Sequence, residues 1–257
     1  PDARRAEPGE TAADVARRAA AALETFLAEN HARIAALIVE PLVQGAAGMA
    51  MHDPEYLRLA RALCDRYEVH LICDEIAVGC GRTGTFFAHE QAGIKPDFLC
   101  LSKGISGGYL PLSVVLTTDK VYAAFYDDAT VRGFLHSHSY TGNALACRAA
   151  LATLDLFAED DVLARNQARG DTLERRLRPL ADHPRVRHFR RRGMILAFDV
   201  EADTGFGRRF YREALARELL LRPMGNTVYV MPPYILGDDD AAFLTTGATA
   251  ALEAALQ

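Results

Sequence analysis

Four short apolar runs in the first half of the chain predict buried β-strands. They span residues 34–39, 69–73, 98–101 and 112–116, and each is apolar over the length of a strand except at His70 and Ser113. Such runs are typical of parallel strands covered on both faces, because both sets of alternating side chains then leave water. Residues 54–67 place apolar side chains at helical spacing between the first two runs. A strand, a helix and a strand in this order predict an α/β sheet.

The other patterns predict further helices and a change of architecture after about residue 158. Thr11 and Asp14 have the spacing of a capping box, at the start of a helix that runs to about Asn30. Further helices are predicted at 143–157, 161–180, 206–220 and 241–256, and strands on both sides of Gly193 within 187–200 and at 227–231. We therefore predict two domains: an α/β domain with a mostly parallel sheet over residues 1–158, and a smaller α+β domain over residues 159–257.

The composition narrows the class of protein. Half of the 257 residues are apolar, a quarter are charged and the net charge is −5, which is ordinary for a soluble globular protein. No apolar run approaches the roughly 18 residues of a membrane helix, and the polar N-terminal residues predict no signal peptide. The only basic cluster, Arg190 to Arg192, is short, so we interpret it as a solvated face rather than a nucleic-acid surface.

The cysteines indicate a reducing compartment. There are five, an odd number, and none has CxxC spacing: Cys64, Cys73, Cys80, Cys100 and Cys147. Most stand in apolar surroundings, which favours buried free thiols over disulfides or metal ligands. We predict a cytoplasmic protein.

Candidate chemistry lies where the predicted strands end. Ligands of α/β sheets bind at the carboxyl ends of the strands. Glu40 follows the first strand, Asp74 and Glu75 follow the second, and Lys103 follows the third. We expect these side chains to meet at one edge of the sheet.

Asp74 and Lys103 each have an ordinary and a functional interpretation. Asp74 is either a cap of the following turn or the partner of a cationic group. Lys103 is either a lysine that extends into solvent or an amine suited to Schiff-base chemistry at the end of an apolar strand. Spacing alone does not decide between them.

Three further residues are candidates with ordinary alternatives. Arg222, between a helix and a strand, is either a surface arginine or a carboxylate-binding group. His136 and His138 are expected on one side of a strand. No third ligand has suitable spacing, so a structural or cofactor-adjacent role is favoured over a metal site.

Together these segments resemble the class III aminotransferases, a family of pyridoxal-phosphate (PLP) enzymes. Residues 73–84, CDEIAVGCGRTG, resemble the family motif at the cofactor ring, and residues 98–104, FLCLSKG, resemble its Schiff-base motif. Val39, Glu40 and Pro41, followed by Gln44 and Gly45, match the preceding strand end. The three motifs stand in family order and cover most of the chain. The resemblance implies fold type I, with residues 1–158 as part of the PLP-binding large domain and 159–257 as the small domain.

The resemblance also implies roles for individual residues. Lys103 would hold PLP as a Schiff base and move protons. Asp74 would pair with the pyridine nitrogen, supported by Glu40, and Ile76 would pack on one face of the ring. Ser139 stands where the family usually has threonine and would bind the PLP phosphate of a partner subunit. The substrate carboxylate would be bound by Arg222, with Tyr229 nearby.

Within the family, residues 74–77, 136–147 and 222–234 resemble the branch that acts in biotin biosynthesis. This implies amino transfer from S-adenosylmethionine to 8-amino-7-oxononanoate in a homodimer whose active site lies at the interface. Two alternatives stay open: another class III enzyme acting on ω-amino acids or diamines, and a catalytically inert fragment. The second arises because the usual N-terminal portion, which supplies a phosphate loop and a ring-stacking residue, is not in this sequence.

Overall fold

The computed structural model describes all residues from 1 to 257, which form two compact units. The first unit comprises Pro1–Leu42, His52–Cys80 and Thr85–Asp160. The second comprises Val43–Met51, Gly81–Gly84 and Asp161–Gln257. Two short segments from the first half of the chain thus belong to the unit formed mainly by the second half. None of the predicted elements falls on these two segments.

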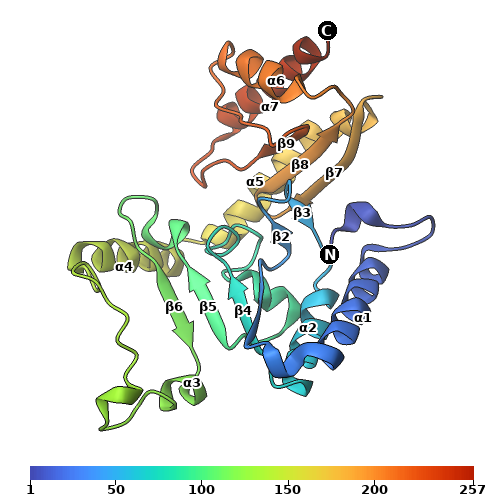
Figure 1. Ribbon diagram of the computed structural model, residues 1–257. Coiled ribbons are helices and arrows are strands. Elements are labelled where there is room, and N and C mark those ends of the chain that lie inside the picture. Colours follow the sequence, from blue (N-terminus) through green and yellow to red (C-terminus); the bar gives the residue numbers. More distant parts are fainter. The chain divides into compact units, whose positions relative to one another are not determined.

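A four-stranded sheet organises the first unit (Figure 1). Its order is β1 (Ala36–Val39), β4 (His70–Asp74), β5 (Phe98–Leu101) and β6 (Val114–Thr117). The first three strands are parallel, whereas β6 runs antiparallel to β5. The prediction of a parallel strand at 112–116 is therefore wrong. Parallel neighbours need a crossover, usually a helix, and the segment between β5 and β6 contains only a 3₁₀ turn.

The first unit has four helices, and the sequence predicted all of them except the one at 119–123. They are α1 (Ala12–Asn30), α2 (Glu55–Arg66), α3 (Asp119–Ala123) and α4 (Ala144–Glu159), with 3₁₀ turns at Ala3–Arg5, His31–Arg33, Ala88–Ala92, Lys103–Ser106 and Thr130–Arg132. The predicted capping box is confirmed: Asp14 N–H donates to Thr11 Oγ1 over 3.2 Å, and Thr11 N–H donates to Asp14 Oδ2 over 2.9 Å. Each side chain thereby satisfies a free backbone donor of the first turn.

The sheet is covered on one face and open on the other. Leu71 and Cys73 of β4 are fully buried, while Ile72 and Asp74, which alternate with them, are only half-buried. Ile38 of β1 pairs with Ile72 and is 62% exposed. The prediction that the strands are buried on both faces is therefore wrong. A continuous apolar run indicates that both faces avoid water, but this chain itself covers only one.

The second unit is an antiparallel sheet with three helices. The sheet has the order β7 (Val186–Arg192), β8 (Ile195–Val200) and β9 (Thr227–Val230), and a two-residue ladder joins β2 (Val43–Gln44) to β3 (Ala50–Met51). The helices are α5 (Val162–Leu177), α6 (Phe206–Leu215) and α7 (Asp238–Leu256), with a 3₁₀ turn at Arg178–Asp182. Aromatic and aliphatic side chains form its core, the largest being Phe198, Phe206 and Phe210. No helix in either unit has both the length and the apolar character needed to cross a bilayer.

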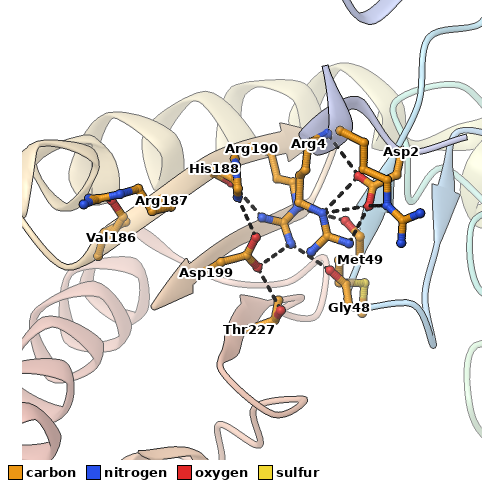
Figure 2. A network of polar contacts seen from close by, with 11 residues as sticks. Asp2, Arg4, Gly48, Met49, Val186, Arg187, His188, Arg190, Asp199 and Thr227 are labelled. Carbon is orange, nitrogen blue, oxygen red and sulfur yellow. Dashed lines mark hydrogen bonds and ion pairs between the residues drawn. The ribbon is translucent and has the colours of Figure 1, made fainter. Parts of the chain in front are cut away.

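The basic cluster on β7 is not a solvated face, contrary to the prediction. The Arg190 side chain is only 10% exposed and donates from Nη2 to Asp199 Oδ1 over 3.1 Å (Figure 2). It also donates to the carbonyls of Gly48 and Met49, over 2.7 and 2.9 Å. Arg191, 11% exposed, pairs with Asp171 over 2.6 Å. These contacts fasten the 43–51 segment and α5 to the sheet of the second unit.

Candidate active site

Three parallel strands of the first unit deliver their ends to one edge of the sheet. Val39 of β1 pairs with Cys73 of β4, so Glu40 follows β1 beside Asp74. Asp74, the last residue of β4, pairs with Cys100 of β5, and Lys103 begins the turn that follows β5. The sequence therefore correctly predicted that these strand ends lie at a common edge.

Asp74 lies half-buried on the open face of the sheet. Its Oδ1 accepts the backbone N–H of Ile76 over 3.1 Å. This bond fixes the carboxylate over the first residues of the following turn and orients it as an acceptor for a further donor. Ile76 is half-buried and lies two residues after Asp74, where it can supply an apolar surface next to the carboxylate.

Lys103 is exposed and adopts the left-handed backbone conformation, with φ +45°. Non-glycine residues rarely adopt this conformation, and they persist in it when surrounding contacts enforce it. Here the turn is held by two hydroxyls: Ser102 Oγ donates to Leu112 O over 2.7 Å, and Ser106 Oγ donates to Leu110 O over 2.6 Å. The turn thus presents an accessible primary amine.

The residue after the lysine packs tightly on the loop that follows Asp74. A Cβ at Gly104 would lie 2.9 Å from the Cβ of Cys80, so only glycine permits this approach. Cys80 is buried with Ile105 and Ala150 in a small apolar cluster. The loop after β4 and the turn after β5 are therefore one packed structure.

Thiols near this edge are poor nucleophiles. Burial raises the pKa of Cys73 to about 12 and that of Cys80 to about 11, with the nearby Glu75 acting in the same direction. Burial, followed by the charge of Asp74, also raises the pKa of Cys100. Because the thiolate is the reactive form, these cysteines are kept inactive at neutral pH.

One strand-end carboxylate, Glu75, was named from the sequence but was given no role there. Glu75 has a fully buried side chain, whose Oε2 accepts Ala88 N–H over 2.6 Å. Its Oε1 accepts His89 N–H and faces His89 Nδ1, both over 2.8 Å. The sequence did contain a signal that separates the two carboxylates. Neighbouring residues at a strand end point to opposite faces of the sheet, so Asp74 and Glu75 have different surroundings.

The remaining predicted residues are not brought to this edge by any described contact. Ser139 is exposed in an irregular segment, and Tyr140 N–H donates to His138 Nδ1 over 3.1 Å. The strand expected at His136 and His138 is absent, and at His138 a turn is formed instead, in which Thr141 N–H donates to His138 O over 3.0 Å. No group of three or more candidate metal ligands is present. Arg222, exposed, and Tyr229, half-buried on β9, belong to the second unit.

The edge thus offers an accessible amine and a fixed carboxylate on neighbouring strands. An amine of this kind forms imines with aldehydes, and a carboxylate keeps a heterocyclic N–H protonated. Residues 2–252, nearly the whole chain, match the family described as Aminotransferase class-III. The chain belongs to the class III aminotransferases.

Two curated relatives of the chain carry the same name. The chain is 46% identical over 233 residues to the adenosylmethionine-8-amino-7-oxononanoate aminotransferase of Helicobacter pylori, covering 88% of this chain and 53% of that protein. It is 44% identical over 222 residues to the protein of that name in Nitratidesulfovibrio vulgaris, covering 82% and 41%. The chain therefore spans about half the length of the curated relatives it matches.

Solved structures support the same class. The ω-transaminase of Pseudomonas jessenii in complex with PMP superposes with a TM-score of 0.92 at 29% identity, over 99% of this chain and 59% of that one. The adenosylmethionine-8-amino-7-oxononanoate aminotransferase of Methanocaldococcus jannaschii gives 0.86 at 30% identity, over 91% and 57%. The fold is that of a fold type I transaminase, as the resemblance implied.

Proposed function

We propose that the chain is part of a PLP-dependent enzyme of biotin biosynthesis. It moves the amino group of S-adenosylmethionine to 8-amino-7-oxononanoate and gives 7,8-diaminopelargonate. One observation carries the proposal: Asp74 ends β4 and Lys103 begins the turn after the adjacent parallel strand β5, in a chain 44–46% identical to two aminotransferases of that name. We infer that the first unit is part of a PLP-binding large domain and the second unit a small domain.

The residues at the sheet edge fit PLP. Lys103 would supply the amine that bonds the cofactor carbonyl, and Asp74, fixed by the Ile76 N–H, would supply the acceptor for the pyridine nitrogen. Glu40 would support Asp74 from the neighbouring strand, and Ile76 would pack on the ring. Ser139, from a partner subunit, would contribute a hydroxyl to the phosphate.

PLP, when bound, supplies an electron sink next to the reacting amine. Once the donor amine has taken its place on the cofactor, Lys103 Nζ would take the proton from the carbon that bears the donor amino group and deliver it for the amino transfer, so one residue would serve as base and acid. Asp74 would keep the ring nitrogen protonated. Arg222 binds the carboxylate of the keto acid through its planar guanidinium, with Tyr229 beside it.

We further propose a homodimer with its active site at the subunit interface. A series of large apolar side chains supports it, since exposed apolar patches mark association surfaces. They include Tyr109, Tyr126, Val131, Leu135, Tyr140 and Leu145, each more than 70% exposed. Light scattering of the purified chain tests this, and a monomer at all concentrations contradicts it.

We also propose a cytoplasmic location. This rests on the odd number of cysteines and on their apolar surroundings, which favour free thiols in a reducing compartment.

The decisive assay measures 7,8-diaminopelargonate by mass spectrometry after incubation with PLP, the keto acid and one amino donor. Product is expected with S-adenosylmethionine. Arg222→Ala should raise the KM for the keto acid, whereas the control Arg217→Ala, which removes an arginine paired with Glu213, should leave it unchanged. Transfer only from ω-amino acids would favour the alternative substrate class. No transfer from any donor would favour an inert fragment.

A further inference from the structure

We propose that Glu75 and His89 form a buried clamp that positions both Asp74 and Lys103 for PLP. The inference rests on the proposed function and adds positioning residues to it. Neither residue touches the cofactor in this account. Their effect passes through the loop that links the ends of β4 and β5.

Glu75 is held from three sides by hydrogen-bond donors. Its carboxylate accepts the backbone N–H groups of Ala88 and His89 and the Nδ1–H of the His89 ring, over 2.6 to 2.8 Å. A carboxylate offers only acceptors, so the histidine nitrogen that faces it is the donor. The Glu75 side chain is fully buried and that of His89 is 10% exposed. Buried charge is costly unless it is hydrogen-bonded, so the carboxylate has one well-defined place.

The backbone of Glu75 connects this clamp to both catalytic candidates. Its N–H donates to Cys100 O over 2.9 Å, next to the Asp74–Cys100 pair of the parallel ladder. Its carbonyl accepts Gly79 N–H over 2.9 Å, which closes the turn that leads to Cys80. A shift of Glu75 therefore moves the end of β4, and with it Asp74.

The other end of the same loop supports the lysine. Cys80 packs against Gly104 and Ile105, the two residues after Lys103. Lys103 adopts its left-handed conformation directly before this contact. The clamp, the turn at 75–79 and the Cys80 contact thus form a continuous path from His89 to the lysine.

A simple alternative is that Glu75 only caps the 3₁₀ turn at Ala88–Ala92. The two accounts differ in which amides lose protection when the carboxylate is removed. If Glu75 is only a cap, its removal lowers the protection of the amides of residues 87–92 alone. A clamp affects residues 76–80 and 104–107 as well.

The test is amide hydrogen exchange of the full chain combined with PLP titration. In Glu75→Gln we expect exchange at 76–80 and 104–107 to accelerate, and PLP binding to weaken, by roughly tenfold each. His89→Phe removes one donor, keeps both backbone donors and preserves the stacking on Phe87, so a smaller change of the same pattern is expected. Glu90→Gln is the control: this exposed carboxylate accepts Phe87 N–H in the same turn and should leave both segments unchanged.

Acceleration confined to 87–92, or equal PLP affinity in Glu75→Gln and Glu90→Gln, overturns the clamp. If Glu75→Gln does not fold, His89→Phe supplies the same comparison. If the wild-type chain takes up no PLP, the proposed function fails for this chain. The exchange pattern then still decides whether the clamp couples the two segments.

Discussion

Asp74 pairs with Cys100 across the parallel ladder of β4 and β5, and Lys103 follows three residues after that partner. A carboxylate on one strand and an amine on the next are thereby placed at the same edge by backbone register. The relationship depends on the sheet rather than on direct contact between the two side chains. Substitutions of the Asp74 or Lys103 side chain that leave the sheet intact should therefore alter PLP binding without altering the fold.

The turn between β7 and β8 provides a test of packing in the second unit. Gly193 has φ +56°, and a Cβ there would lie 2.5 Å from Arg82 O. Gly193→Ala should lower the free energy of unfolding by about 3 kcal/mol or more, because backbone overlap adds to the left-handed strain. Gly225→Ala, with φ +59° and open space around the position, should lose only about 1 kcal/mol. Equal losses in urea unfolding would contradict the close approach.

Arg190 should contribute more to stability than Arg187 of the same strand. Arg190→Ala leaves the Asp199 carboxylate and the carbonyls of Gly48 and Met49 without this donor, and should lower the free energy of unfolding by about 3 kcal/mol. Arg187→Ala removes a half-exposed pair with Glu201 and should lose less than about 1 kcal/mol. Urea unfolding of both variants measures the difference. A similar small loss in both would restore the interpretation of a solvated face.

The hydrogen bonds of Asp199 predict that the folded protein loses stability in acid. Burial alone would raise the pKa of Asp199, but hydrogen bonds from Thr227 and Arg190 outweigh it and hold the pKa below its usual value. A lowered pKa in the folded state stabilises the protein above the ordinary aspartate pKa of about 4, and this contribution is lost as the pH falls through the lowered value.

Asp199→Asn should therefore reduce stability at pH 7 and flatten its decline below about pH 4. The free energy of unfolding, measured between pH 7 and pH 3, tests this. The control Asp128→Asn, at an exposed position, should follow the wild-type curve. An unchanged slope in Asp199→Asn would show that other groups cause the acid sensitivity.

Much of the fold could be predicted because local signals and tertiary structure agree. The capping box at Thr11, the helix between β1 and β4, and the two strands around Gly193 all follow from periodicity and turn residues. The α6 helix ends earlier than predicted, at Leu215. Glu218 adopts φ +59° and Leu219 N–H returns to Ala214 O, a C-terminal turn that apolar periodicity does not reveal.

The features that could not be predicted from the sequence depend on contacts between residues far apart in the chain. The strands at 43–44 and 50–51 are too short to produce a pattern. The burial of Arg190 depends on carbonyls some 140 residues earlier in the chain. Glu75 looks in sequence like a second copy of Asp74, and only the Ala88–His89 backbone distinguishes it. For the site, the strand ends were predictable, while the role of the loop between them was not.

The central claim is that Lys103 is the residue that binds PLP. The most direct measurement is the visible absorbance of the chain after addition of PLP and removal of excess, for wild type, Lys103→Ala and the control Lys95→Ala, another lysine of the first unit. We predict a band of lysine-bound PLP in wild type and Lys95→Ala that is missing from Lys103→Ala. An equal band in all three proteins, or none in wild type, would contradict the account.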